Sequence, residues 1–281
     1  MSTPASPLTA LLFTPGSRLD RLPKAVASGA DGVIVDLEDS IAMADKDRVP
    51  TEVVAYFNQH GGVQADRLFV SAIRLNNLRG SVGISDLDAF NAAGSKPDIV
   101  MLSKVESATE VQLAARKLPE SVRLVCLIET VQGVRRCASI AEASPRLVAL
   151  AFGGLDLSAE TGGEPTWDAL LWPRTTVVHA CSAAGLLALD QPYIDFANAA
   201  GLEQECVQTR PLGFTGKLAI HPSQVAIIQR AYQPTAEQVA RARKIVAAYA
   251  AAGGNVANVD GQMIDVPIYR SAQRVLQRAG Q

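Results

Sequence analysis

The sequence predicts a closed (β/α)8 barrel carried by a chain of 281 residues. Eight short apolar runs alternate with Ala- and Leu-rich stretches at helical spacing, an order that indicates a parallel sheet. Several of the runs are apolar throughout, as expected for strands that are covered on both faces. Eight strands within about 220 residues favour a closed barrel over an open, doubly wound sheet.

The candidate strands are rich in aliphatic and β-branched residues and are bounded by polar clusters. They are Leu11–Thr14, Gly32–Asp36, Leu68–Arg74, Asp98–Leu102, Arg123–Ile128, Leu147–Phe152, Leu186–Leu189 and Lys217–Ile220. Stretches with helical spacing lie between and after them. These candidate helices include Leu19–Ser28, Ser107–Leu118, Thr166–Ala184, Asp195–Arg210 and Pro222–Tyr232.

The pattern changes after the eighth strand, so we assign residues 1–232 to the barrel and 233–281 to a C-terminal helical segment. Thr235 is a suitable N-cap for a helix over Ala236–Ala252, and a final helix is expected over Ile268–Arg278. The segment is longer than a minimal barrel needs, and it is interpreted as either packing decoration or a lid. No linker or repeat separates it, so a second full domain is not predicted.

Composition excludes several classes of function. Lys plus Arg (26) and Asp plus Glu (28) give a net charge of −2, so no basic surplus exists to bind a nucleic acid backbone or an anionic membrane. Four cysteines at irregular spacing indicate buried, reduced thiols. Neither a signal-peptide pattern nor an uninterrupted apolar run of membrane-spanning length occurs, so a cytoplasmic protein is expected.

Polar residues able to do chemistry follow almost every candidate strand. In a barrel all these strand ends meet at one mouth, where active sites of this fold lie. Any one of them could instead simply cap the next helix. In chain order they are Asp36 with Glu38, Arg74, Lys104, Glu129, Asp156, Asp190 and His221.

The strongest local signal is a pair of carboxylates just past the fifth and sixth strands. Glu129 lies in LIET and Asp156 in AFGGLDLSAETG. Two carboxylates from adjacent strand ends suit Mg²⁺, which leaves its other positions to water and substrate. Gly153 and Gly154 would let the backbone approach a ligand closely. The alternative is that both carboxylates pair with arginines or cap helices.

An acidic cluster follows the second strand in VDLEDS. Its members Asp36, Glu38 and Asp39 need neutralising partners, which Lys46 and Arg48 could supply in a purely structural network.

Arg74 ends a buried strand, and its planar guanidinium could bind a substrate carboxylate with two hydrogen bonds. It could equally be a partner for Asp36 or Glu38. We interpret His221 as a buried, hydrogen-bonded histidine in preference to a catalytic one. Serine-hydrolase (GxSxG) and dinucleotide-binding (GxGxxG) signatures are absent from the sequence.

Taken together, the motifs resemble the citrate lyase β-subunit-like branch of the HpcH/HpaI aldolase family. The match covers nearly the whole chain in the order expected for that family. Its motifs are LFTPG (residues 12–16), DLEDS (36–40), RLN (74–76), KVESA (104–108), LIET (127–130), AFGGLDLSAETG (151–162), GFTGKLAIHPSQ (213–224) and DGQMID (260–265).

The resemblance implies a Mg²⁺-dependent carbon–carbon lyase, with Mn²⁺ as a substitute metal, acting on 3-hydroxyacyl thioesters such as citryl-, malyl- or citramalyl-CoA. It implies that Glu129 and Asp156 bind the metal and that Arg74 clamps the carboxylate of the oxo or hydroxy acid. Asp36 and Glu38 would support the clamp and the metal-bound waters. A homo-oligomer, either a trimer or a hexamer, is also implied.

Two further roles follow from the same resemblance. The backbone amides of Gly153, Gly154 and Leu155 would bind the substrate carboxylate. Asp265 matches an acid on the C-terminal lid of family members, and this lid often reaches a neighbouring subunit. In a Claisen-type cleavage, Asp265 would protonate the thioester enolate, and lid closure would exclude water.

The chain departs from the family pattern in two places. Thr9-Ala10 stand where members often have Arg-Ser, so contacts at the mouth with substrate or CoA could differ. Ser103 replaces the usual proline before KVESA.

Three other functions remain open at this point. One is an aldolase that uses free pyruvate or oxaloacetate, although such relatives place a histidine near the second strand and residues 36–46 contain none. Another is a citrate lyase subunit that acts on an acyl-carrier-protein thioester. The third is a non-catalytic barrel that binds an acyl-CoA or a keto acid.

Overall fold

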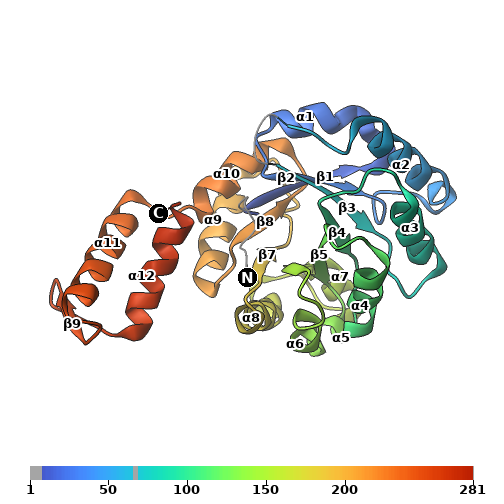
Figure 1. Ribbon diagram of the computed structural model, residues 1–281. Helices are drawn as coiled ribbons and strands as arrows, with labels where there is room; N and C mark the ends of the chain where they lie inside the picture. The colour runs from blue at the N-terminus through green and yellow to red at the C-terminus, as the bar shows by residue number, and fades with distance from the viewer. Residues whose placement is uncertain (1–7, 66–68, 281) are drawn as a thin grey trace. The chain divides into compact units, whose positions relative to one another are not determined.

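Eight parallel strands close into a barrel in the computed structural model, which describes residues 8–65 and 69–280. Each strand pairs with the next one in sequence, and the eighth pairs with the first (Figure 1). The predicted (β/α)8 fold is therefore confirmed. Closure brings all carboxyl ends of the strands to one rim of the barrel.

The strands agree with the expected ones to within one or two residues at each described end. Leu68, where one predicted strand begins, lies outside the described residues. The strands are β1 (Ala10–Pro15), β2 (Gly32–Asp36), β3 (Val70–Leu75), β4 (Ile99–Leu102), β5 (Arg123–Ile128), β6 (Leu147–Phe152), β7 (Leu187–Asp190) and β8 (Gly216–Ala219).

Helices surround the barrel (Figure 1), and none of those described has the length and apolarity that a membrane span would need. The 3-10 helices are η1 (Gly16–Arg21), η2 (Met43–Asp45) and η3 (Arg210–Leu212). The α-helices are α1 (Leu22–Ala27), α2 (Arg48–His60), α3 (Ser81–Ala92), α4 (Ala108–Lys117), α5 (Val131–Arg135), α6 (Cys137–Ala141), α7 (Gly154–Thr161), α8 (Trp167–Ala184), α9 (Ala199–Thr209) and α10 (Pro222–Tyr232).

Helix α9 begins four residues later than the helical spacing predicts. The side chain of Asn198 accepts a hydrogen bond from the amide of Gly201 and so caps the helix at that point. Residues 191–198 therefore stay in a loop at the mouth of the barrel. This loop carries Ile194 and Phe196, whose side chains are exposed.

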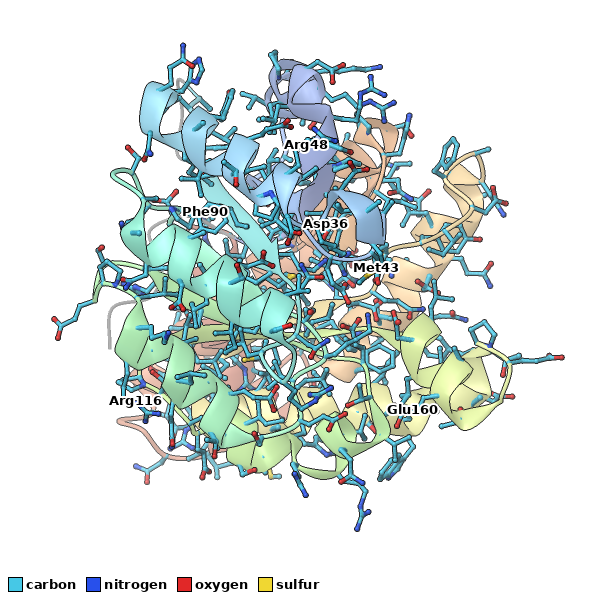
Figure 2. The ribbon with its side chains drawn as sticks, turned by 90° about the vertical axis from the view of Figure 1, so that its right-hand side faces the viewer. Asp36, Met43, Arg48, Phe90, Arg116 and Glu160 are labelled. Carbon is cyan, nitrogen blue, oxygen red and sulfur yellow. The ribbon has the colours of Figure 1, made fainter. Side chains whose placement is uncertain are left out.

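The barrel interior is a packed apolar core that fills the space between the strands. Charged side chains such as Arg48, Arg116 and Glu160 lie on the outer helices, whereas Asp36 and Phe90 are buried (Figure 2). The four cysteines are buried and free, as predicted. The interior cluster consists of Leu8, Leu11, Ile34, Ala72, Ile99, Met101, Val125, Leu127, Ala149, Ala151, Leu189 and Leu218.

A second compact unit begins at Tyr232. It contains α11 (Ala236–Ala251), a hairpin of β9 (Ala257–Val259) and β10 (Gln262–Ile264), and α12 (Val266–Arg278). Thr235 caps α11 as predicted, in a capping box with Gln238. The hairpin was not predicted, although its Asp260-Gly261 turn, with φ values of 54° and 83°, is a strong hairpin signal.

A buried ionic cluster joins β7 and β8 to the helices outside them. Asp190 is fully buried and accepts hydrogen bonds from Arg174 on α8 and from Lys217 on β8. Lys217 also contacts Glu205 on α9 at 2.5 Å. Asp190 is one of the polar residues that the sequence places at a strand end. It stabilises the barrel through these ion pairs and does not line the cavity at the mouth that is described below.

We expect Asp190→Ala to lower the free energy of unfolding by about 3–5 kcal/mol, because it removes the fully buried carboxylate that two buried cations share and leaves only Glu205 near them. Asp88→Ala, which removes an exposed partner of Lys117, should cost less than about 1 kcal/mol and is the control. Urea unfolding of the two variants measures the difference. Similar losses would show that the buried cluster does not contribute to the stability of the barrel.

Candidate active site

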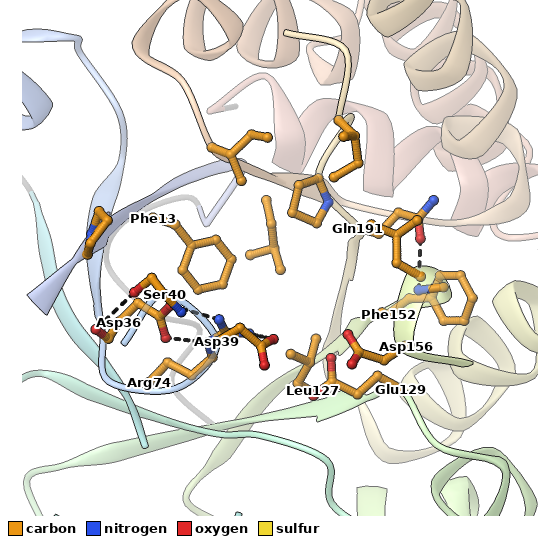
Figure 3. Close-up of a pocket in the computed structure, with 18 residues that line it drawn as sticks. Phe13, Asp36, Asp39, Ser40, Arg74, Leu127, Glu129, Phe152, Asp156 and Gln191 are labelled. Carbon is orange, nitrogen blue, oxygen red and sulfur yellow. Dashed lines mark hydrogen bonds and ion pairs between the residues drawn. The ribbon is translucent and has the colours of Figure 1, made fainter. Parts of the chain in front are cut away.

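A cavity of about 410 Å³ opens at the carboxyl ends of the strands (Figure 3). Residues at or just beyond the ends of β1, β2, β3, β5, β6, β7 and β8 line it, among them Leu218 and Ile220. This is the rim at which the strand-end polar residues were expected to converge. Of these, the cavity brings together Asp36, Arg74, Glu129 and Asp156.

Glu129 and Asp156 face this cavity from neighbouring strand ends (Figure 3). Glu129 directly follows β5 and is buried, and its Oε1 accepts a hydrogen bond from the amide of Lys104 at 2.9 Å. Asp156 lies in the first turn of α7 and is half-exposed. No described residue donates a hydrogen bond to Oε2 of Glu129 or to the carboxylate of Asp156, so both have oxygens available to a ligand.

The two glycines before Asp156 make room for their neighbours. A Cβ on Gly153 would lie 2.6 Å from Oε2 of Glu129, and a Cβ on Gly154 would lie 2.4 Å from Oε1 of Gln191. Neither contact is sterically possible for a side chain. Glycine at these positions therefore allows Glu129 and Gln191 to approach the start of α7.

The backbone amides at the start of α7 are less available than the sequence suggested. The amide of Gly153 donates to the carbonyl of Ile128 at 3.0 Å, and that of Gly154 donates to Gln191 at 2.8 Å. The expectation that all three amides from Gly153 to Leu155 face a ligand therefore does not hold in this structure. Only Leu155 keeps an amide without an acceptor among the described residues.

Arg74 is held by acids that follow β2. Its Nε and Nη2 donate to the two oxygens of Asp36 at 2.7 and 2.8 Å, in a two-bonded pair. Its Nη1 lies 3.0 Å from Oε2 of Glu38 without hydrogen-bond geometry, so that buried oxygen has no donor. The guanidinium also lies over the ring of Phe13, at 4.7 Å from its centroid. Nη1 also lies 3.6 Å from Oδ2 of Asp39, so a ligand at the Nη1–Nη2 end of Arg74 would share it with these carboxylates.

Lys104 is the second cation of the site, and it had no assigned role in the sequence. Its ammonium contacts Glu38, lies 3.2 Å from Asp39 and lies 3.5 Å from Asp156. Its backbone is in the left-handed region at a φ of 49°, an uncommon conformation for a non-glycine residue that often marks functional sites. Lys104 therefore links the acids of the β2 loop to the pair at β5 and β6.

The partners predicted for the acidic cluster after β2 were wrong. Lys46 donates to the backbone carbonyls of Leu37 and Glu38 and to the side chain of Asn76, so it holds the loop and not its carboxylates. Arg48 pairs with acids on its own helix and the turn before it. The acids are neutralised instead by Arg74 on β3 and by Lys104 after β4, which are too distant in the sequence to be recognised as partners.

Several acidic side chains are buried close together in the site, and burial and neighbouring charges shift their pKa values. Burial, together with the charges of Glu38 and Asp156, raises the pKa of Glu129 to about 8. Burial likewise raises the pKa of Glu38 to about 7, against the opposing charges of Arg74 and Lys104. At Asp36 burial also acts upward, but the hydrogen bonds and charge of Arg74 outweigh it, and the pKa is lowered.

This arrangement can hold one hard divalent cation through two carboxylates. Mg²⁺ prefers oxygen ligands and commonly takes one or two carboxylates together with water and substrate oxygens. Within residues 8–65 and 69–280, no group of three or more His, Cys, Asp or Glu side chains is arranged for a metal. A cation here would thus take only Glu129 and Asp156 from the protein, and a chelating substrate could complete its coordination.

Asp265, Thr9 and Ala10 were also singled out in the sequence. Asp265 belongs to the second unit, where its side chain accepts a hydrogen bond from the amide of Ile268 and caps α12. The amides of Thr9 and Ala10 bind Asp31 at the start of β1, the barrel end opposite the mouth. The departure from the family at positions 9 and 10 therefore cannot alter the mouth by direct contact.

Other contributors to the site were missed. Gln191, just after β7, holds the start of α7 and lines the cavity together with Phe13 and Phe152. A polar residue following a strand was the only signal for Gln191. His221, expected to be buried, is half-buried; its ring stacks on Phe196 and its Nδ1 contacts Ser223.

Comparisons with known proteins agree with this geometry. The family described as HpcH/HpaI aldolase/citrate lyase matches residues 9–222, and that described as C-C bond lyase of the TIM-barrel fold matches residues 166–281. The chain is 34% identical to the citrate lyase subunit beta of Escherichia coli K12, over 96% of this chain and 92% of the relative. It is 31% identical to an L-malyl-CoA/beta-methylmalyl-CoA lyase of Cereibacter sphaeroides, over 98% and 96%.

A solved structure is similar along the whole chain. It is the protein CitE from Mycobacterium tuberculosis in complex with magnesium, acetoacetate and coenzyme A, with a TM-score of 0.82 and 33% identity over 99% of both chains.

We expect Glu129→Gln to stabilise the metal-free protein at pH 8 by about 1–3 kcal/mol. The folded protein keeps a proton on Glu129 up to about pH 8, whereas the unfolded chain releases it near the ordinary value of 4.5. Stability contributed by this group is therefore lost as the pH rises from 4.5 to 8, and glutamine does not titrate. Urea unfolding in EDTA at pH 4.5 and 8 tests this; an equal difference at both pH values would contradict it.

Proposed function

Because the chain belongs to the HpcH/HpaI aldolase/citrate lyase family, it is a carbon–carbon lyase, and we propose its reaction as follows. The enzyme cleaves, or in reverse forms, a 3-hydroxyacyl thioester such as citryl-, malyl- or citramalyl-CoA, and the products are acetyl-CoA and a 2-oxo acid. The observation that carries the proposal is the pair of available carboxylates, Glu129 and Asp156, beside Arg74 in one cavity.

Glu129 and Asp156 are the proposed ligands of Mg²⁺, for which Mn²⁺ could substitute. The fit rests on donor chemistry: two carboxylates with available oxygens face one cavity, and the charge of Asp156 helps to raise the pKa of Glu129. Bound there, Mg²⁺ would act as a Lewis acid toward the carboxylate and hydroxyl or keto oxygens of the substrate. The raised pKa of Glu129 means that a cation must favour its ionised form for the site to load near neutral pH.

Arg74 is proposed to bind the carboxylate of the 2-oxo acid with its Nη1–Nη2 end. Asp36 orients the guanidinium through two hydrogen bonds, and Phe13 covers its face, so little freedom remains to be lost on binding. Asp36 and Glu38 are therefore positioning residues. Glu38 does not line the cavity, and it acts through its contacts with Arg74 and Lys104.

The start of α7 supplies a second contact for the same carboxylate. The amide of Leu155 is the donor we propose, because those of Gly153 and Gly154 already have acceptors. Gly153 and Gly154 contribute by allowing the close approach of Glu129 and Gln191. A carboxylate at this end of the helix is also favoured by the partial positive charge of the helix N-terminus.

Cleavage turns the 3-hydroxyl group into the keto group of the 2-oxo acid with loss of the hydroxyl proton, while the electrons of the breaking carbon–carbon bond pass to the thioester. The resulting enolate takes up one proton on carbon, which balances the proton lost from the hydroxyl group. Asp265 is the acid we propose for this step, delivered by a lid formed by residues 233–281 of the same or a neighbouring subunit. Support comes from the DGQMID motif and from the half-exposed position of Asp265 at the head of α12. Closure of such a lid would exclude water and protect the enolate.

We further propose that the enzyme is a homo-oligomer, a trimer or hexamer; a lid shared between subunits would require at least a dimer. We place it in the cytoplasm. Four free, buried cysteines are in keeping with a reducing compartment.

The purified protein should release acetyl-CoA and a 2-oxo acid from one of malyl-, citramalyl- and citryl-CoA in the presence of Mg²⁺. EDTA should abolish the reaction, and Glu129→Gln should lower kcat by about 100-fold or more while weakening Mg²⁺ binding measured calorimetrically with oxaloacetate present. Glu142→Gln, on an exposed helix end, is the matched control.

The outcomes of this assay separate the competing functions. Cleavage of a thioester that is indifferent to EDTA and to Glu129→Gln would refute the metal site. Turnover of free pyruvate or oxaloacetate adducts alone would replace the thioester lyase with an aldolase. Turnover of an acyl-carrier-protein thioester alone would make the chain a subunit of a citrate lyase complex.

Asp265→Asn should lower kcat by about 100-fold, the usual scale of a lost general acid, and leave the Mg²⁺ dissociation constant unchanged. Asparagine keeps the cap of α12, so the second unit should stay folded. Asp260→Asn, an exposed substitution in the same unit, is the control. Equal losses of turnover and metal binding, or no loss of turnover, would contradict the role of Asp265.

A further inference from the structure

In the described part of the chain, one hydrogen bond orients the carboxylate of Glu129. Its donor is the amide of Lys104, which lies 2.9 Å from Oε1. Lys104 follows β4 and Glu129 follows β5, so this bond crosses between two neighbouring strand ends. Whatever fixes the backbone of Lys104 therefore also fixes one of the two proposed metal ligands.

The backbone of Lys104 has an uncommon conformation. Its φ of 49° lies in the left-handed region, which is unfavourable for most residues that carry a Cβ. The other non-glycine residue described with a positive φ is Asp260, which lies in the hairpin turn of the second unit. Aspartate and asparagine tolerate this region through local hydrogen bonds, and lysine does not. Contacts around Lys104 must therefore hold its backbone in place.

Arg79, in the segment after β3, makes such a contact. Its Nη1 donates to the carbonyl of Lys104 at 2.5 Å. Two acids at the start of α4 fix the same guanidinium, with Nη1 3.2 Å from Oε2 of Glu110 and Nη2 3.2 Å from Oε1 of Glu106. Glu110 in turn accepts hydrogen bonds from the amide of Glu106 and the hydroxyl of Ser107. Arg79 therefore ties the peptide after Lys104 to the first turn of α4.

The effect of Arg79 on the site is indirect, because Arg79 does not line the cavity that holds Glu129. It reaches Glu129 only through the carbonyl and the amide of one residue, Lys104. Hydrogen bonds from the hydroxyl of Ser103 and the amide of Val105 fix the residues on either side to β3 and β5. Arg79 adds the bond that holds the carbonyl of the left-handed residue itself.

We propose that Arg79 is a positioning residue for the metal ligand Glu129, which it orients through the left-handed backbone of Lys104. The proposal rests on the metal site of the proposed function and adds to it a residue from outside the cavity. Groups that orient a metal ligand commonly contribute about ten- to a hundredfold to metal affinity. Without the guanidinium, residue 104 relaxes toward negative φ, and its amide no longer holds Oε1 in place.

The sign of the effect separates positioning from electrostatics. Arg79→Met removes a positive charge near the rim, which by charge alone would strengthen the binding of a divalent cation. Loss of positioning weakens binding instead. We expect Arg79→Met to raise the dissociation constant of Mg²⁺ or Mn²⁺, titrated calorimetrically without substrate, by about tenfold. In turnover assays the Mg²⁺ concentration for half-activation should rise in parallel, with kcat at saturating Mg²⁺ within about twofold of wild type.

Two further variants serve as controls. Arg79→Lys keeps the charge and one donor, so its dissociation constant should stay within about threefold of wild type. Arg116→Met removes an exposed arginine of α4 (Figure 2) and should leave metal binding unchanged. Unchanged or tighter metal binding in Arg79→Met would overturn the proposal.

The route through Lys104 has its own test. Asparagine adopts the left-handed region more readily than lysine, so Arg79 is needed less when residue 104 is asparagine. In a Lys104→Asn background, Arg79→Met should change the dissociation constant by less than about threefold. The loss of the ammonium cancels, because both members of this pair lack it. An undiminished tenfold effect in this background would overturn the role of the left-handed backbone.

Hydrogen exchange in EDTA needs neither metal nor turnover. The peptide that spans residues 103–107 should exchange faster in Arg79→Met than in wild type, and unchanged protection would overturn the positioning role. If wild type binds neither Mg²⁺ nor Mn²⁺, the proposed lyase site fails, and the role of Arg79 toward a metal ligand fails with it. If wild type binds the metal and cleaves a thioester but Arg79→Met binds the metal equally well, the role of Arg79 fails alone.

Discussion

The closed parallel ladder of eight strands is the constraint on which the rest of the structure depends. A barrel has no sheet edges, so each strand pairs with a neighbour on both sides, and every carboxyl end points to the same rim. Residues separated by more than one hundred positions, such as Asp36 and Asp156, therefore line one cavity. The helices and loops add residues to that rim, but the strand order fixes where it lies.

Several acidic side chains converge at this rim, and two cations at the mouth of the barrel neutralise part of their charge. Asp36, Glu38, Glu129 and Asp156 would repel one another in a buried site. Arg74 binds the acids of β2, and Lys104 spans from those acids to Asp156. Neutralisation is incomplete at Glu129, whose pKa stays raised. A divalent cation bound there would lower the free energy needed to ionise this carboxyl group.

The same charge pattern divides the mouth into regions with different partners. Acids surround the proposed reaction centre, whereas Arg21 and Lys24 line a cavity of about 340 Å³ beside it, between the ends of β1 and β8 and the helices η1 and α1, without carboxylate partners among the described residues. The net charge of −2 over the whole chain conceals this separation, because it sums the two regions.

The sequence by itself determined the barrel, the carboxyl end of each strand to within one residue and the candidate carboxylates, because buried parallel strands require apolar runs and the residues after them must face the mouth. It also determined helix caps such as Thr235, where the signal is local. Only the tertiary structure decided which cation neutralises which acid: Lys46, near in sequence, binds backbone carbonyls, and Lys104, distant in sequence, takes its place. It likewise decided that Asp190 belongs to the scaffold and that the amides of Gly153 and Gly154 are already bound. The physical reason is that ion pairs and hydrogen bonds depend on distances between strand ends, which barrel closure sets and local sequence patterns do not encode.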